Sequence, residues 1–406
     1  MGRWRDWSNG RSGSVLLRSI RGRLAASARY RLTDYAEASA AQGKRVRDAL
    51  GRLKEQERLT TLATSGAEAL ANHSRHHARA TRKANLLARS NRSVLIGPWC
   101  GEVGFELLYW IPFVTWMTER ARLDGRRVTV LTRGGAHIWY RHLSGRDVEI
   151  LDRLTPHEFR AQGRTLKQDV LSSFDRTLID DAIGGATAAF AKAMAPRLSR
   201  PHLVHPLLMY RLFIPYWREE PVVEPISAFT RYRPLVPPQD HPVLRTLPDE
   251  FVAVKFYFSH AFPDTAFNRD FVRRVVTDLS EQWPVVVLNS GERLDDHEDA
   301  LVPEGPRIRI VRTDARDNLA TQSAVVSRAR AFAGTYGGFS YLAPMYGVNS
   351  LSFFSDRGNL VPFHLEHANR VFAALDGGRF IAMDVHDLDV VASALPRHVT
   401  AHVTNA

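Results

Sequence analysis

The sequence has a single cysteine and no long apolar run, and these two absences exclude several classes of protein. Cys100 is the only cysteine among 406 residues, so an internal disulfide and a metal site with several cysteine ligands are both excluded. No stretch of about 18 apolar residues occurs, so no membrane-spanning helix is predicted. The lack of disulfides fits a reducing compartment, and we expect a cytoplasmic protein. No cysteine–histidine signature accompanies Cys100, which is more typical of a small buried side chain than of a nucleophile.

Most of the chain has no excess of positive charge, because the excess lies in residues 1–92. The net charge is +12, but residues 1–92 hold 20 Lys and Arg against 7 Asp and Glu, and the remaining residues have a net charge of −1. The part of the chain after residue 92 therefore does not select its ligand by a broad basic surface. Residues 1–92 also lack proline, and their apolar residues recur at helical spacing. We expect a basic helical arm there, ordered or partly disordered.

Three interpretations of this arm stay open. Trp4 and Trp7 among arginines would suit a helix on an anionic membrane surface, which would make the protein peripheral at the inner face of a membrane. The alternatives are a solvated or self-associating arm and, least favoured, nucleic acid, because no known nucleic-acid motif is present. His73, His76 and His77 have no carboxylates beside them, so a solvated face is expected there rather than a metal site.

The rest of the chain alternates apolar strand patterns with amphipathic helix patterns. Such alternation predicts parallel sheets covered by helices. A passage dense in proline, residues 221–248, interrupts the alternation and is typical of a connector. The predicted fold class is therefore α/β, with two Rossmann-like domains facing a cleft. Residues 93–240 would form the first domain and residues 241–406 the second, after the helical arm 1–92.

Residues 93–117 contain the most informative pattern of the sequence. An apolar run ends there in a turn that contains Gly101, Glu102 and Gly104, and an apolar helical pattern follows. Open α/β proteins build their sites at the carboxyl ends of strands, so Glu102 is predicted to be functional, with the two glycines shaping its turn. Arg133 follows a neighbouring strand and is placed on the same side. The alternative is that Glu102 only caps the helix.

Residues typical of a phosphate site follow three strands of the second region. Adjacent glycines let backbone N–H groups approach an anion, and a serine can cap the next helix, whose positive end points to the same place. Because the strand ends of one sheet converge on one crevice, these residues are expected to lie together. The candidate donor-binding residues are Lys255, Asn289, Ser290, Gly291, Thr335, Tyr336, Gly337, Gly338, Ser340 and, at the rim, Glu366.

These motifs resemble those of GT-B glycosyltransferases, most of all the heptosyltransferase-type enzymes. Such enzymes place a glycine-acidic turn after their first strand, which residues 101–104 resemble, and a donor-phosphate segment that residues 333–348 resemble. The sequence departs from the pattern at two points, since Glu102 stands where Asp is usual and residues 339–340 replace a histidine. The likeness covers about residues 93–395.

The resemblance implies a hexosyl- or heptosyl-type transferase of polysaccharide biosynthesis. It would move a sugar from a nucleotide-sugar donor to a glycan or lipid-linked acceptor. Glu102 would be the general base for the acceptor hydroxyl, while the glycine amides and Lys255 would stabilise the leaving diphosphate without a metal or other cofactor. Two alternatives stay open. One is another activated-donor transferase, such as a pyruvyl transferase, and the other is a non-catalytic scaffold that binds a glycan or a nucleotide.

Overall fold

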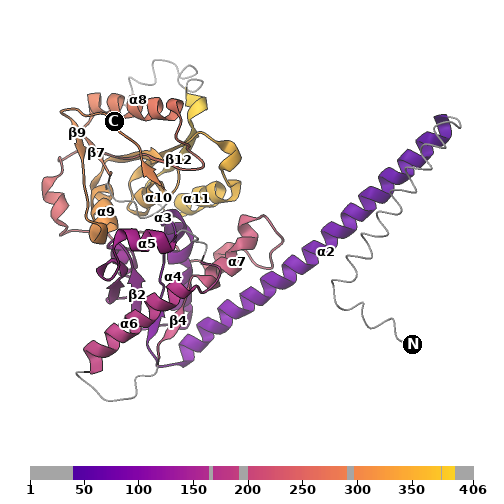
Figure 1. Ribbon diagram of the computed structural model, residues 1–406, viewed down its shortest axis with the longest axis horizontal. Coiled ribbons are helices and arrows are strands. Elements are labelled where there is room, and N and C mark those ends of the chain that lie inside the picture. The colour runs from indigo at the N-terminus through magenta and orange to yellow at the C-terminus, as the bar shows by residue number, and fades with distance from the viewer. Residues whose placement is uncertain (1–39, 164–167, 192–199, 290–296, 376, 389–406) are drawn as a thin grey trace. The chain divides into compact units, whose positions relative to one another are not determined.

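The computed structural model describes residues 40–163, 168–191, 200–289, 297–375 and 377–388 (Figure 1). The chain contacts divide it into two compact units, Met1–Ala71 and Asn72–Ala406. Helix α2 (Ala40–Arg89) contributes to both units, so the predicted arm is helical from Ala40 onward. Within the described residues, no helix is both long and apolar enough to cross a membrane.

The first sheet of the second unit has four strands, and all of its strand pairs are parallel. Its central strand, β1 (Val94–Ile96), is an apolar segment whose three residues are all buried, as expected for a strand covered on both faces. Val94 pairs with Val128 on one side and with His202 on the other. In spatial order the strands are β3 (Asp147–Glu149), β2 (Val128–Thr132), β1 and β4 (His202–Val204).

The second sheet has six strands, again paired in parallel throughout. On its central strands, successive side chains enter two different apolar clusters, so both faces are covered. Val252 and Val254 face one cluster, whereas Ala253 faces the other. In spatial order the strands are β12 (Phe380–Asp384), β11 (Asn349–Phe354), β10 (Ala331–Thr335), β5 (Val252–Lys255), β7 (Val285–Val287) and β9 (Ile308–Ile310). A separate antiparallel pair joins β6 (Tyr257–Phe258) to β8 (Glu298–Asp299).

Helices connect and cover these strands. The helix that follows β1 starts as the short α3 (Val103–Phe105), passes through a π-helical turn at Glu106–Trp110 and continues as α4 (Ile111–Ala121). Helix α8 (Ala266–Gln282) starts where the Thr265 hydroxyl accepts a hydrogen bond from the backbone of Asn268, and its apolar side packs on the second sheet. The other α-helices that follow are α5 (Pro156–Gly163), α6 (Ser173–Ala191), α7 (Leu207–Trp217), α9 (Asn318–Arg328), α10 (Gly338–Met345) and α11 (Pro362–Ala374).

The two sheets lie on either side of the proline-rich passage, which confirms the predicted α/β class with two parallel sheets. They do not fold as isolated bodies, because one apolar cluster draws on both. Direct bonds also cross between them, for example from the Trp139 indole N–H to the Ser323 hydroxyl at 2.9 Å. Both halves of the second unit therefore share a core.

Candidate functional site

The acidic turn after β1 is held in place by its own side chains and its neighbours. The Trp99 ring lies between the rings of Trp110 and Tyr210, with centroids 5.8 and 5.9 Å away. Its indole N–H donates to the carbonyl of Glu102 at 3.3 Å. The backbone N–H of Cys100 donates to the side-chain oxygen of Gln168, which is itself buried. The turn is thus preorganised, since its backbone polar groups are bonded to fixed side chains.

A buried ion pair lies directly beneath the turn. Arg133 contacts Glu106 at 2.7 Å and donates to the carbonyl of Gly101 at 2.5 Å, while the Tyr140 hydroxyl donates to Glu106 at 2.6 Å. Burial raises the pKa of Glu106, and the guanidinium and the tyrosine hydroxyl oppose that rise. Arg133, placed by the sequence on the acceptor side, therefore positions the turn from below. Glu106 was missed by the sequence analysis.

Glu102 itself is exposed at the start of α3. Glu102 is the N-cap residue of α3, but among the described residues its side chain makes no capping hydrogen bond to that helix. Its backbone carbonyl instead accepts from the Glu106 N–H at 3.1 Å. Burial raises the pKa of Tyr210, and the negative charge of Glu102 raises it further. A Cβ atom built on Gly101, the residue before Glu102, would lie 3.3 Å from the Tyr210 hydroxyl oxygen.

The glycine turn after β10 is closed by bonds of its own. Gly337 and Gly338 have φ angles of 108° and 21°, values that favour glycine. The Ser340 hydroxyl donates to the carbonyl of Gly337 at 2.7 Å and accepts from its N–H at 3.0 Å. Thr335 bonds the backbone of Tyr257 in the same reciprocal way. The buried hydroxyls of Ser340 and Thr335 are thus committed to shaping the turn at the start of α10.

The acidic turn and the glycine turn lie against each other. A Cβ atom built on Gly104 would lie 3.0 Å from the backbone nitrogen of Gly338, and one built on Gly338 would lie 3.9 Å from the Cβ of Val103. Residues 101–104 and residues 336–338 follow strands of different sheets, so the carboxyl ends of the two sheets meet here. Glu102 is two residues away from this contact. The structure therefore brings together the two passages that the sequence singled out.

Lys255 is the last residue of β5, which pairs with β10, and Asn289 follows β7 on the other side of β5, but both side chains already have partners. The Lys255 ammonium donates to the carbonyl of Leu288 at 2.7 Å, pairs with Asp299 at 3.0 Å and lies 5.2 Å from the centre of the Phe339 ring. Asn289 donates to the carbonyl of Ala300 at 3.1 Å. Ser290 and Gly291 lie outside the described residues. Tyr336 is half-buried next to the glycine turn, where burial raises its pKa to about 12.

A second junction between the sheets forms where β2 ends. The carboxylate of Glu149 accepts from the backbone N–H groups of Gly134 and Gly135 at 2.9 and 3.0 Å. Burial raises the pKa of Glu149 to about 7, although these two donors oppose the rise. The carbonyl of Gly134 accepts from Leu319 of α9 at 2.7 Å. Glu149, which the sequence analysis did not select, thus fixes the turn that docks on the second half.

Three half-buried aromatic rings border the acidic turn on the side of α7 and α11. Phe105 lies 5.1 Å from both Trp217 and His364, and these two rings are 5.8 Å apart. Beneath them, the Tyr109 hydroxyl lies 2.5 Å from the His364 ring nitrogen Nδ1. We call Phe105, Trp217 and His364 the aromatic patch. Because an aromatic face can pack on the apolar C–H face of a sugar ring, the patch suits the acceptor side of the site.

Glu366, predicted at the donor rim, is an exposed residue of α11. It forms an ion pair with Arg370 one helical turn further on, at 3.4 Å. Its side chain is 69% exposed, so this pair contributes little to stability. The role assigned to Glu366 from the sequence stays a prediction.

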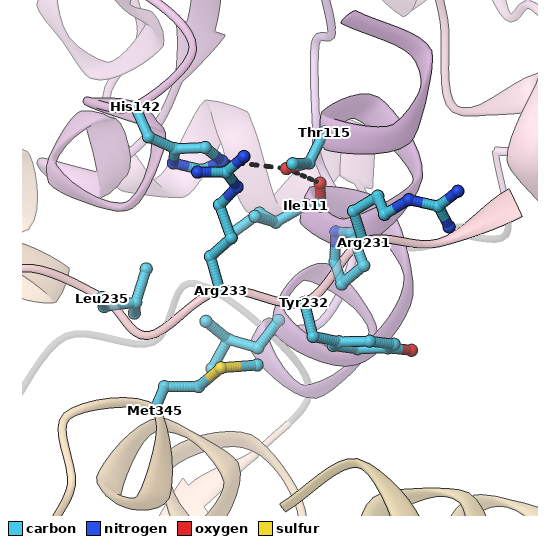
Figure 2. Close-up of a pocket in the computed structure, with 10 residues that line it drawn as sticks. Ile111, Thr115, His142, Arg231, Tyr232, Arg233, Leu235 and Met345 are labelled. Carbon is cyan, nitrogen blue, oxygen red and sulfur yellow. Dashed lines mark hydrogen bonds between the residues drawn. The ribbon is translucent and has the colours of Figure 1, made fainter. Parts of the chain in front are cut away.

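Figure 2 shows a pocket elsewhere in the second unit, between α4 and residues 231–235. The Thr115 hydroxyl donates to the carbonyl of Ile111 at 2.7 Å and lies 2.9 Å from Nε2 of His142, whose ring N–H therefore donates to it. Burial lowers the pKa of His142, so its ring is neutral at pH 7. The described residues that line this pocket include none of the predicted site residues, so the pocket is separate from the predicted site.

No family model and no curated protein match this chain. Solved structures do match, among them a family 9 glycosyltransferase from Veillonella parvula, at 11% identity and a TM-score of 0.39, over 75% of this chain and 89% of that one. The heptosyltransferase WaaC from E. coli with ADP matches at 12% identity and a TM-score of 0.35, over 72% and 92%. The dodecameric glycosyltransferase TibC from enterotoxigenic E. coli matches at 10% identity and a TM-score of 0.36, over 65% of this chain and 58% of that one, less than two thirds of its length.

Glycosyltransferases of this kind are the class that the two sequence passages resemble. The matches also include a UDP-N-acetylglucosamine 2-epimerase, which is a different class of enzyme. Identities of 10 to 12% and TM-scores below 0.5 are too low to transfer an activity. The fold described above therefore rests on the strands and helices themselves, and the function on the site.

Proposed function

We propose that this chain is a glycosyltransferase that moves a sugar from a nucleotide-sugar donor to a glycan or lipid-linked acceptor. The observation that supports this most is the contact between Gly104 and Gly338, which joins an exposed carboxylate to a glycine turn at the start of a helix. Ligands of open α/β sheets bind outside the carboxyl ends of the strands, and here two sheets present those ends to each other.

The donor diphosphate would bind at the glycine turn. The backbone N–H of Gly338 and the positive end of α10 can stabilise its negative charge, while the Gly337 N–H stays bonded to the Ser340 hydroxyl. Lys255 lies beside the first turn of the same helix. These groups would stabilise the charge that develops on the leaving diphosphate without requiring a metal. Because Gly104 lies against the Gly338 nitrogen, binding requires the two turns to move apart.

The acceptor would bind on the other side of the turn, next to Glu102. The acceptor oxygen attacks the anomeric carbon of the sugar, the bond from that carbon to the diphosphate oxygen breaks, and the bond electrons leave with the diphosphate. Glu102 takes the hydroxyl proton as general base. Arg133 and Gln168 hold the backbone of the turn, and the aromatic patch would support the acceptor ring. We place this reaction in the cytoplasm, at the inner face of a membrane.

The test is the pair of variants Glu102→Gln and Glu250→Gln. Glu250 is an exposed glutamate paired with Arg330 and serves as the matched control. Release of nucleoside diphosphate is measured from a panel of nucleotide sugars, with a membrane extract as the source of acceptor. We expect Glu102→Gln to lose about 10²- to 10⁴-fold in turnover and to keep its affinity for the diphosphate, while the control is unchanged.

Other outcomes separate the alternatives. If Glu102→Gln turns over normally, the assignment of the base is wrong. If the protein binds a nucleoside diphosphate but consumes none of the nucleotide sugars, the non-catalytic scaffold is supported instead. A pyruvyl transferase would release phosphate from an enol-phosphate donor and leave the nucleotide sugars intact.

A further inference from the structure

The last turns of helix α2 carry a row of arginines along one side. Arg75, Arg79, Arg82 and Arg89 are all exposed and follow one another at intervals that keep them on a single helical face. We call these four residues the basic face. They belong to the second compact unit, together with both sheets.

The opposite side of the same helix segment is fixed to the body of the second unit. Ala80, Ala84 and Leu87 are fully buried in the core cluster. His73 is also fully buried, its Nδ1 accepts from the backbone N–H of Val223 at 3.0 Å, and its ring lies 5.2 Å from that of Tyr216. The expectation of a solvated face at the histidines is therefore wrong for His73. The basic face has a defined orientation on the unit as a result.

Nothing in the local sequence neutralises this face. No Asp or Glu occurs between Glu68 and Glu102, whereas residues 72–92 contain six Lys and Arg. Among the described residues, none of the ion pairs involves the four arginines. Elsewhere on the unit exposed arginines do pair with carboxylates, as Arg233 does with Glu119 at 2.5 Å. The basic face is thus a concentration of uncompensated positive charge.

The pKa values of neighbouring groups are lowered by nearby positive charge. Burial lowers the pKa of His76, and Arg79, Arg211 and Arg75 lower it further. Burial also lowers the pKa of Lys83, with a further contribution from Arg92, which is not part of the basic face. His76 thus experiences the positive potential of two arginines of the basic face.

The shape and composition of the face favour a membrane over a nucleic acid. From Arg75 to Arg89 a straight helix extends about 21 Å, which presents a flat row of cations. Leu86 lies within the row and is 49% exposed, an apolar side chain that suits a lipid interface. Residues 72–92 contain no Phe, Tyr or Trp, the side chains on which single-stranded bases stack.

We propose that the basic face binds the anionic headgroups of a lipid bilayer and so orients the second unit on a membrane surface. Polybasic segments of this kind are attracted to anionic leaflets, and the attraction falls off within a Debye length. The proposal does not rest on glycosyl transfer, because it concerns a different surface of the unit.

The experiment compares the full chain with two charge-matched variants. One replaces Arg75, Arg79, Arg82 and Arg89 by glutamine. The control replaces four exposed arginines far along the sequence, Arg273, Arg274, Arg328 and Arg379, in the same way. Co-sedimentation is measured with vesicles of phosphatidylcholine alone and of equal parts phosphatidylcholine and phosphatidylglycerol, at low and high salt.

We expect the wild type and the control to bind the vesicles that contain phosphatidylglycerol but not those of phosphatidylcholine alone. Their binding should be weaker at high salt than at low salt. The basic-face variant should bind at least about a hundredfold more weakly. Equal binding by both variants, absence of binding to phosphatidylglycerol vesicles, or tighter retention on single-stranded nucleic acid than on vesicles would overturn the proposal. Turnover of a soluble nucleotide sugar should be the same in both variants. This measurement therefore distinguishes failure of the membrane-binding proposal from failure of the proposed glycosyl transfer.

Discussion

Replacing Arg133 by methionine tests the buried ion pair beneath the acidic turn. In the wild type, Arg133 neutralises Glu106 and anchors the carbonyl of Gly101, and both charged side chains are buried. The variant leaves the Glu106 carboxylate buried with only the Tyr140 hydroxyl as partner. Breaking a buried pair in this way lowers the free energy of unfolding by about 3–5 kcal/mol. Turnover should also fall at temperatures where the variant is folded, because the turn that carries Glu102 loses its anchor.

A second variant separates the charge effect from simple loss of packing. Glu106→Gln combined with Arg133→Met leaves no buried charge at this site, so the double variant should lose less stability than the sum of the two single variants, by about 0.5–3 kcal/mol. The pH dependence gives an independent check. In Arg133→Met, the folded protein should bind a proton on Glu106 at pH values where the unfolded carboxyl, with a pKa of about 4.3, has released it. The loss relative to wild type should therefore be smaller at pH 5 than at pH 7.5.

Urea unfolding followed by tryptophan fluorescence measures these effects, since Trp99 and Trp110 lie next to the turn. The free energy is obtained by linear extrapolation for the transition of the second unit. A loss below about 1 kcal/mol for Arg133→Met, with no change between pH 5 and pH 7.5, would refute the reasoning.

Three further results are expected. Gly135→Ala should lower the free energy of unfolding, measured in urea, by about 1–3 kcal/mol, because Gly135 has a φ of 76° and a Cβ atom there would lie 2.7 Å from the Cβ atom of Ala320. The control Gly145→Ala should have little effect, because a Cβ atom on Gly145 would have no atom within 4 Å. Burial lowers the pKa of His367 to about 4, so the wild type should lose up to about 3 kcal/mol of stability as the pH falls from 6.5 to 4, and His367→Gln should lose less over that range. Trp217→Leu should raise the KM for the acceptor about two- to tenfold and leave the binding of nucleoside diphosphates unchanged.

The sequence predicted the elements whose patterns are local. The apolar run at Val94–Ile96 and the amphipathic periods of α8 and α9 have regular spacing, and the structure has a strand and two helices there. Strand β4 and helix α7 were not predicted. Both lie in a stretch with several prolines, and Pro215 lies inside α7, where a proline is normally a sign that a helix has ended. Trp217 and Tyr210, which border the acidic turn, were missed with them.

The site was predicted only as far as its two turns. The glycines around Glu102 and the glycines after β10 are visible in the sequence, but the contact between Gly104 and Gly338 joins residues far apart in the chain, which no local pattern encodes. Glu106 could have been found by a simple signal. A carboxylate within an apolar helical run is costly to bury and so requires a partner, and Arg133 was already a candidate residue.

The most direct test of a diphosphate site between the two sheets is a thermal-shift screen of the full chain against ADP, UDP, GDP, CDP and dTDP. A ligand that binds only the folded protein stabilises it by about 2.7 kcal/mol at a hundredfold excess over its Kd. We expect at least one of these nucleotides to raise the midpoint of unfolding in a concentration-dependent way. If none of the five raises it at millimolar concentration, the glycine turn does not hold a nucleoside diphosphate and the proposed reaction is contradicted.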